Sequence, residues 1–178
     1  MEYDFEKFSK YNMPVFSWDY EDLPKYEHWS RMADAYISCC LHLLYSMSNE
    51  RLNRNFFIGK VCVSLFDHSV ELFLKFAIIV ATDEFPITHN LQKLYDKYCS
   101  LYQEDAFQFE VDIESIVRKN PAYPYNTFAK YPVDNEGNLW TGNAHIDIII
   151  WLKYAKITHK DFLRLEPLII EKYINQSG

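Results

Sequence analysis

The segment Asn55–Ala81, NFFIGKVCVSLFDHSVELFLKFAIIVA, decides the fold of this chain. It is apolar almost throughout, and its polar positions recur at steps of three and four residues: Lys60, Ser64, Asp67, His68, Glu71 and Lys75. On an α-helix this spacing gathers them into one narrow stripe and leaves the rest of the circumference apolar. The segment therefore predicts a helix that neighbours surround on most sides and that opens to water along the stripe. Glu71 precedes Lys75 by four residues, the favourable order for an ion pair on a helix.

Shorter helices are predicted on both sides of this central segment. Residues 27–47 carry apolar side chains at helical spacing, which predicts an amphipathic helix. Asp83 and Pro86 are expected to end the central helix, and Thr88 is expected to cap a helix over 89–102. Further helices are predicted over 111–118 and over 158–174, the last with Thr158 as its cap.

The segment 120–142 differs from its surroundings because it holds three of the seven prolines and two of the four glycines. Its Asp134-Asn135-Glu136-Gly137 stretch is a turn signal, so a small β-hairpin or irregular insert is expected around 125–150. Residues 145–151 are apolar and rich in β-branched side chains, which fits either a short strand or the start of a buried helix.

These elements predict a mainly α fold, an antiparallel up-down helical bundle of four to five helices. Four glycines in 178 residues are few, as expected when helices replace turns. The polar and aromatic residues 1–25, broken by Pro14 and Pro24, predict an N-terminal arm packed on the core. Residues 26–178 are then expected to form a single domain.

Composition limits the classes of function. The net charge of −7 disfavours a broad, non-specific grip on nucleic acid, although a local basic groove stays open. The four cysteines show no C-x-x-C spacing, which favours buried thiols in a reducing compartment. Residues 1–10 have no apolar core, and charges interrupt the longest apolar runs. A cytoplasmic location without a membrane segment is therefore expected.

No complete catalytic motif is visible in the sequence. His68 and Glu71 have the spacing of metal sites in helical bundles, but Asp34 and Glu166 do not complete a matching set of carboxylates. There is also no G-x-S-x-G elbow and no P-loop. We therefore expect neither a metal nor a cofactor.

Two motifs in succession point to a family. Residues 66–75, FDHSVELFLK, contain E-x-x-L-K, and residues 86–91, PITHNL, follow after a short break. Over about 25–176 the chain resembles the HEPN family. The resemblance implies an antiparallel helical bundle that usually dimerises. It also implies a metal-independent ribonuclease or toxin, an RNA- or nucleotide-binding module, or an inactive relative.

Active members of that family carry an Arg followed by four to six residues and a His, placed late in the domain at the dimer cleft. Here Arg118 is followed at the fifth position by Tyr123, and Lys130-Tyr131-Pro132 has Lys where the family has Arg. Lys153 and His159 have the spacing but again lack the Arg. The resemblance thus offers Arg118, Tyr123 and Lys130 as candidate catalytic residues. Its candidate ligand contacts are Lys75, His89, Lys130 and Tyr131.

Three functions follow as expectations. The first is a HEPN-like binding module, non-catalytic or weakly active, that acts as a homodimer on a nucleotide, RNA or a partner protein. A nucleotidyltransferase-type protein is one such partner, as in a toxin–antitoxin pair. The alternatives are a metal-independent ribonuclease and a structural or assembly protein.

Overall fold

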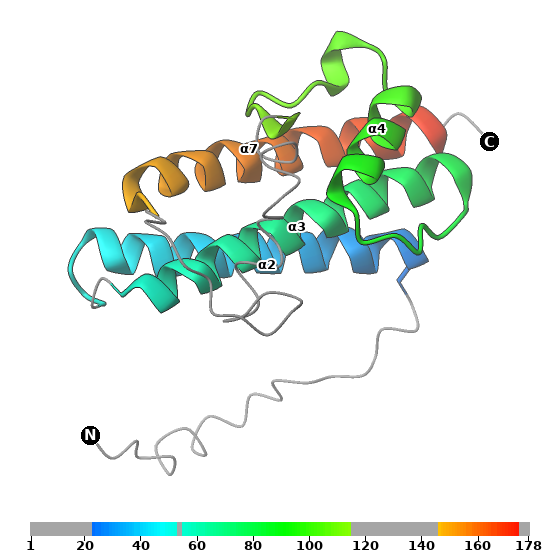
Figure 1. Cartoon of the computed structure of the whole chain (residues 1–178). Coiled ribbons are helices and arrows are strands. Elements are labelled where there is room, and N and C mark those ends of the chain that lie inside the picture. The colour runs from blue at the N-terminus through cyan, green and yellow to red at the C-terminus, as the bar shows by residue number, and fades with distance from the viewer. Residues whose placement is uncertain (1–22, 53–54, 115–145, 175–178) are drawn as a thin grey trace.

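The computed structural model describes residues 23–52, 55–114 and 146–174. These ranges contain helices and no strand, which confirms the predicted mainly helical bundle. Among these helices, none combines the length and the apolar composition that a membrane span needs. The elements are α2 (Lys25–Ser48), α3 (Phe56–Thr82), α4 (Leu91–Leu101), the short 3₁₀ helix η1 (Asp105–Phe107) and α7 (Ile148–Tyr173) (Figure 1).

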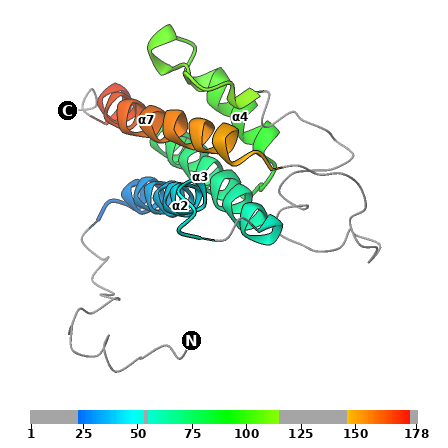
Figure 2. The ribbon, with the colours of Figure 1, turned by 90° about the vertical axis from the view of Figure 1, so that its left-hand side faces the viewer.

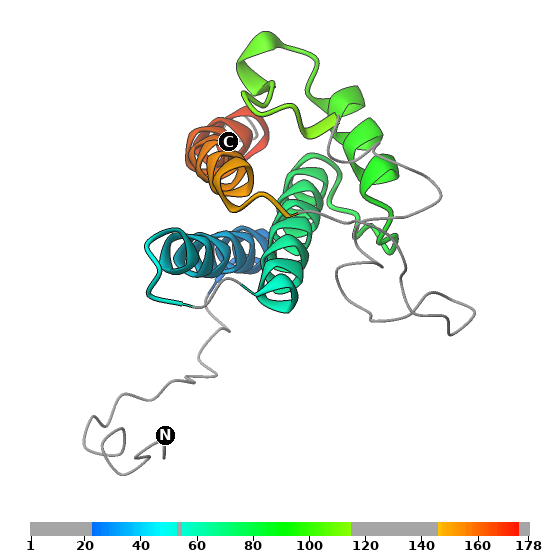
Figure 3. The same ribbon diagram turned by 60° about the vertical axis from the view of Figure 1, so that its left-hand side comes forward.

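Helix α3 lies at the centre of the bundle and packs against α2, α4 and α7 (Figures 2 and 3). Helices α2 and α3 run in opposite directions, so the Cys40 thiol, late in α2, donates to the Cys62 carbonyl early in α3. Helix α7 runs in the same direction as α3, and the rings of Phe73 and Phe162 stack with centroids 4.2 Å apart. Helix α2 is therefore antiparallel to both of the long helices on which it packs.

The ends of α3 follow directly from the local sequence. The Asn55 side chain accepts a hydrogen bond from the Phe57 amide at 2.8 Å, which satisfies one of the free amides at the helix start. At the other end Asp83 adopts a left-handed conformation, with φ of 57°. A single residue in this conformation ends a helix by turning the chain away from its axis. The predicted helix 55–81 is thus confirmed.

The predicted opening of the polar stripe to water is wrong. Lys60, Glu71 and Lys75 are only 7%, 4% and 2% exposed, and Asp67 is equally buried. From Gly59 to Ile78, every residue of α3 except Val61 is buried or half-buried. The stripe is covered because segments distant in the sequence fold over it, which the periodicity of one helix does not reveal.

One of these covering segments is the stretch 83–90, which we call the strap. After Asp83 the strap turns back, and its His89 reaches Glu71, about 18 Å earlier along α3. Asn90 then caps α4 by accepting from the Lys93 amide at 3.0 Å. The prediction that Thr88 caps this helix is wrong, because the Thr88 hydroxyl instead accepts from the Asn90 amide within the strap.

Helix α7 starts ten residues before the predicted last helix. Asp147 caps it by accepting from the Ile149 and Ile150 amides at 2.9 and 3.1 Å. Residues 148–151 are therefore helical, and Thr158 lies buried inside α7 instead of capping it. The predicted arm up to residue 22, the predicted insert around 125–150 up to residue 145, and residues 115–118 of the predicted helix 111–118 lie outside the described residues. Residues 148–150, at the end of the predicted insert, are helical and not part of a hairpin.

A buried aspartate fastens the segment after α4 to α7. Asp161 is fully buried, and its Oδ2 accepts from the Glu110 and Val111 amides at 2.9 and 3.2 Å. Its Oδ1 accepts from Arg164, which also donates to the Ala106 and Gln108 carbonyls. We call this arrangement the Asp161 clamp. It fixes residues 106–111 on α7, across the long connection that leads into that helix.

The cysteines yield a prediction about reactivity. Burial raises the pKa of the Cys62 thiol to about 11 and raises that of Cys40 as well, whereas Cys39 is exposed. A pKa of 11 leaves about 0.1% thiolate at pH 8, and thiolate is the reactive form. In native protein iodoacetamide is expected to modify Cys39 at least ~100-fold faster than Cys40 and Cys62, as measured by peptide mass spectrometry. In urea the difference should vanish, and equal native rates would contradict the buried placement.

Candidate functional site

A single carboxylate joins α3 to the strap. Glu71 Oε1 lies 2.8 Å from His89 Nδ1 and 3.0 Å from Lys75 Nζ. Its Oε2 lies 3.9 Å from His68 Nδ1, and the His68 ring meets Tyr36 of α2 edge-on. The Glu71 side chain is only 6% exposed. Lys75 and His89 therefore share one carboxylate that is buried. This carboxylate therefore determines where the strap lies on α3.

The ammonium of Lys75 is enclosed by aromatic rings as well as by Glu71. Its Nζ lies 5.8 Å from the ring centroid of Trp29 on α2 and 5.4 Å from that of Phe85 on the strap. Ring faces at this distance attract a cation, and the attraction strengthens when water is excluded. Lys75 thereby links three elements of the fold, α2, α3 and the strap.

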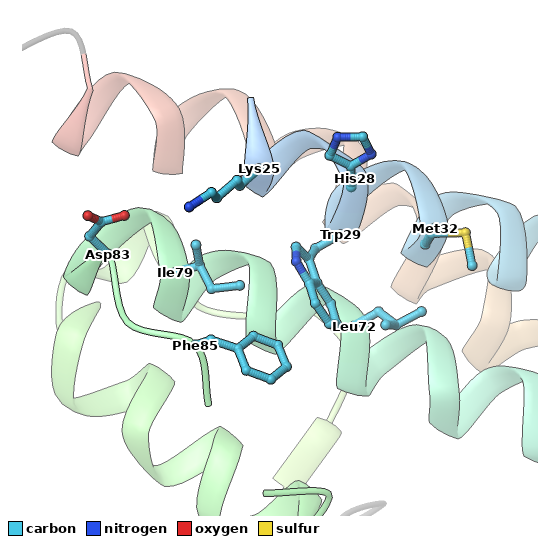
Figure 4. Close-up of a pocket in the computed structure, with 8 residues that line it drawn as sticks. All are labelled: Lys25, His28, Trp29, Met32, Leu72, Ile79, Asp83 and Phe85. Carbon is cyan, nitrogen blue, oxygen red and sulfur yellow. The ribbon is translucent and has the colours of Figure 1, made fainter. Parts of the chain in front are cut away.

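Next to this junction lies a groove of about 600 Å³ between α2, α3 and the strap (Figure 4). Apolar side chains form most of its lining, and polar groups stand at its edges. Trp29 and Phe85, with centroids 5.0 Å apart, meet at its inner side. Its lining consists of Lys25, His28, Trp29, Met32, Leu72, Ile79, Asp83 and Phe85.

The groove presents apolar groups to solvent. Met32 is 48% exposed and Phe85 is 52% exposed, large values for side chains of this size. Lys25 and His28 come from the first two turns of α2, while Asp83 stands at the end of α3 (Figure 4). An apolar floor with a few charged groups at its edge is the usual composition of a ligand site.

The structure brings two of the sequence-predicted ligand residues together. Lys75 and His89 both contact Glu71. The Lys75 side chain is 3% exposed and is paired to Glu71. His89 is 77% exposed and stays accessible. The other predicted site residues, Arg118, Tyr123, Lys130 and Tyr131, lie outside the described residues.

The groove itself was not predicted from the sequence. Trp29 and Met32 belong to the apolar spacing over 27–47, which predicts a helix face and nothing about a groove. The available signal was in the strap, where Phe85 and Ile87 are apolar residues in a short break between helices. In such a break, exposed residues are normally polar, so an aromatic residue there indicates a contact with another element or a ligand.

Lys153 and His159 do not form a pair. Six residues apart on a helix, they project about 120° apart around its axis. His159 points to α2, where its Nε2 lies 2.8 Å from Asp34 Oδ1, while Lys153 is exposed. Of the two residues with the family's Arg–His spacing, His159 thus makes a contact between α7 and α2.

Within 23–52, 55–114 and 146–174, no three His, Cys, Asp or Glu side chains gather as a metal site would require. Comparison of the chain with protein-family models, with curated proteins and with solved structures gives no match.

Proposed function

We propose that the chain is a HEPN-like, non-catalytic binding module that acts as a homodimer and takes a segment of a partner protein into the groove. The observation that carries this is the open, apolar groove with Met32 and Phe85 exposed on its lining. Aromatic side chains of a partner would fill the floor, since they bury large apolar areas at little entropic cost. Lys25 at the edge favours carboxylates on the same segment.

A protein ligand suits the groove better than RNA does. Of the eight lining residues only Lys25 is a permanent cation, and Asp83 opposes it with a negative charge. Affinity for RNA rests on several cations that neutralise phosphates, and the chain has a net charge of −7. A second nearby cation, Lys75, is paired to Glu71 beneath the surface. The resemblance makes a nucleotidyltransferase-type protein the first partner to assay.

A second apolar surface supports the dimer. The starts of α3 and α7 lie side by side, since a Cβ placed on Gly59 would stand 3.1 Å from the Ile146 side chain. Exposed apolar side chains occur in the first turns of both helices and include Phe57 at 68% on α3 and Ile149 at 66% on α7. Exposed apolar side chains of this size are typical of surfaces that another protein covers. The whole set is Phe56, Phe57, Val61, Ile149 and Ile150.

Selection of peptides on the full chain tests the groove. From a displayed library of random eight-residue peptides, we expect sequences that combine aromatic residues with Asp or Glu. Phe85→Glu and Met32→Glu should each weaken the selected peptides at least ~10-fold in fluorescence anisotropy, as loss of a central contact does. The matched control is Leu163→Glu, at an equally exposed apolar position on α7. Peptides that bind both groove variants as well as wild type would place the binding elsewhere.

The same preparation separates the other functions. Retention of a generic single-stranded RNA with no effect of the groove variants would favour an RNA-binding module instead. Cleavage of that RNA, lost in Arg118→Ala or Lys130→Ala, would favour the ribonuclease. Peptide binding without RNA cleavage would favour the proposed non-catalytic binding module. If neither peptides nor RNA bind and a stable dimer persists, the assembly role is favoured.

A further inference from the structure

The groove opens at the place where the N-terminal residues enter the fold. Lys25 is both the first residue of α2 and a residue of the groove lining. From Lys25 to Met32 the groove follows about 10 Å of α2. An extended chain spans up to about 3.3 Å per residue, so the residues from Phe16 to Leu23 have ample length to turn back along it.

The sequence just upstream of α2 has the chemistry that the groove favours. Residues 16–21, FSWDYE, alternate aromatic side chains with Ser17, Asp19 and Glu21. In an extended segment, alternate side chains point to opposite faces. One face would then carry three aromatic rings, and the other would carry a hydroxyl and two carboxylates.

Charge gives this segment a preferred side of the groove. Residues 1–22 contain six acidic and two basic side chains. Lys25 and His28 stand at the α2 edge of the groove, and Asp83 stands at the end of α3. Lys25 attracts an acidic segment to the α2 edge, and Asp83 repels it from the end of α3, so charge favours a path along α2.

We propose that residues 16–21 occupy the groove of their own chain and compete with the partner segment. This proposal rests on the proposed function of the groove, and it adds that the chain's own arm regulates partner binding there. A tethered segment acts at an effective concentration of about 1 mM or more, so even a weak contact in cis excludes most of a free competitor. The partner's apparent affinity is the intrinsic affinity multiplied by the fraction of grooves that stay open.

Competition with a free copy of the segment tests the proposal. A fluorescein-labelled peptide with the sequence of residues 14–22, PVFSWDYED, is titrated with full-length protein and followed by anisotropy. The full-length variant Phe16→Ser/Trp18→Ser/Tyr20→Ser should bind this peptide about 10-fold more tightly than wild type, because its groove is open. The matched control Tyr3→Ser/Phe5→Ser/Phe8→Ser removes three aromatic rings further upstream and should bind as wild type does.

The outcomes separate this proposal from the function of the groove. Equal affinity of wild type and the 16/18/20 variant, with binding still lost in Phe85→Glu, would overturn the arm as occupant and leave the groove as a partner site. If the peptide does not bind the 16/18/20 variant, the proposal that the arm occupies the groove is overturned as well. If the library peptides also fail to bind, the proposal that the groove is a partner site is overturned too. If the 10-fold gain disappears on dilution and light scattering shows a dimer, the occupant is the arm of a second copy.

Discussion

Replacement of Glu71 by alanine is expected to lower the free energy of unfolding by about 3–5 kcal/mol, the usual cost of breaking a buried ion pair from one side. The Lys75 ammonium would lose its 3.0 Å partner while it stays enclosed by Trp29 and Phe85. The hydrogen bond that holds His89 on α3 would be lost as well. Urea denaturation of wild type and variant gives the difference directly.

A double replacement separates the charge from the packing. Glu71→Leu with Lys75→Met removes both charges together, and a buried pair exchanged for apolar residues of similar size is often neutral. The double variant should therefore recover most of the stability that Glu71→Ala loses. A loss below ~1 kcal/mol in Glu71→Ala would show that water reaches Lys75, against its buried position. Amide exchange in the strap should rise in Glu71→Ala because the strap is released.

Asp161→Ala is expected to have an effect of similar size, about 3–5 kcal/mol, for a different reason. Asp161 accepts from two backbone amides and from Arg164, and it is fully buried. Alanine would leave the Val111 amide buried without its acceptor and would leave the guanidinium of Arg164 without its carboxylate. Thermal and urea unfolding measure the loss of stability.

The site of the damage is part of this prediction. Amide exchange at Glu110 and Val111 should rise first, because these two amides donate to the lost carboxylate. Glu171→Ala is the matched control, since it removes an exposed carboxylate from the same helix and should change stability by less than ~0.5 kcal/mol. Equal losses of stability in Asp161→Ala and Glu171→Ala would mean that the hydrogen bonds of the clamp contribute nothing beyond the effect of removing one negative charge.

Helical periodicity predicts the parts of the fold that depend on one helix alone, namely where the helix runs and which of its faces is apolar. The pattern over 27–47 corresponds to α2, whose buried residues include Ala33, Ile37 and Cys40. The run over 55–81 corresponds to α3, with the expected Glu71–Lys75 pair formed at 3.0 Å. Both predictions needed only neighbours three and four residues apart.

Contacts between distant segments could not be predicted in this way. The stripe on α3 has the same spacing whether water or a strap covers it, and the strap reaches Glu71 only because Asp83 turns the chain back. The start of α7 is ambiguous in the sequence because a run of isoleucines fits both a strand and a buried helix, although Asp147 caps the helix in the structure. The groove combines Trp29 and Phe85, which lie far apart in the sequence.

The Asp161 clamp also has a consequence for how the chain tolerates insertions. It joins residues 50 positions apart, so it ties Val111 to α7 at a point that the length of the intervening chain does not affect. The entropy of closing a loop grows only logarithmically, and doubling its length costs about 0.6 kcal/mol. Relatives of this chain are therefore expected to differ most in length between residues 114 and 146, while Asp161 and Arg164 keep the two ends in register.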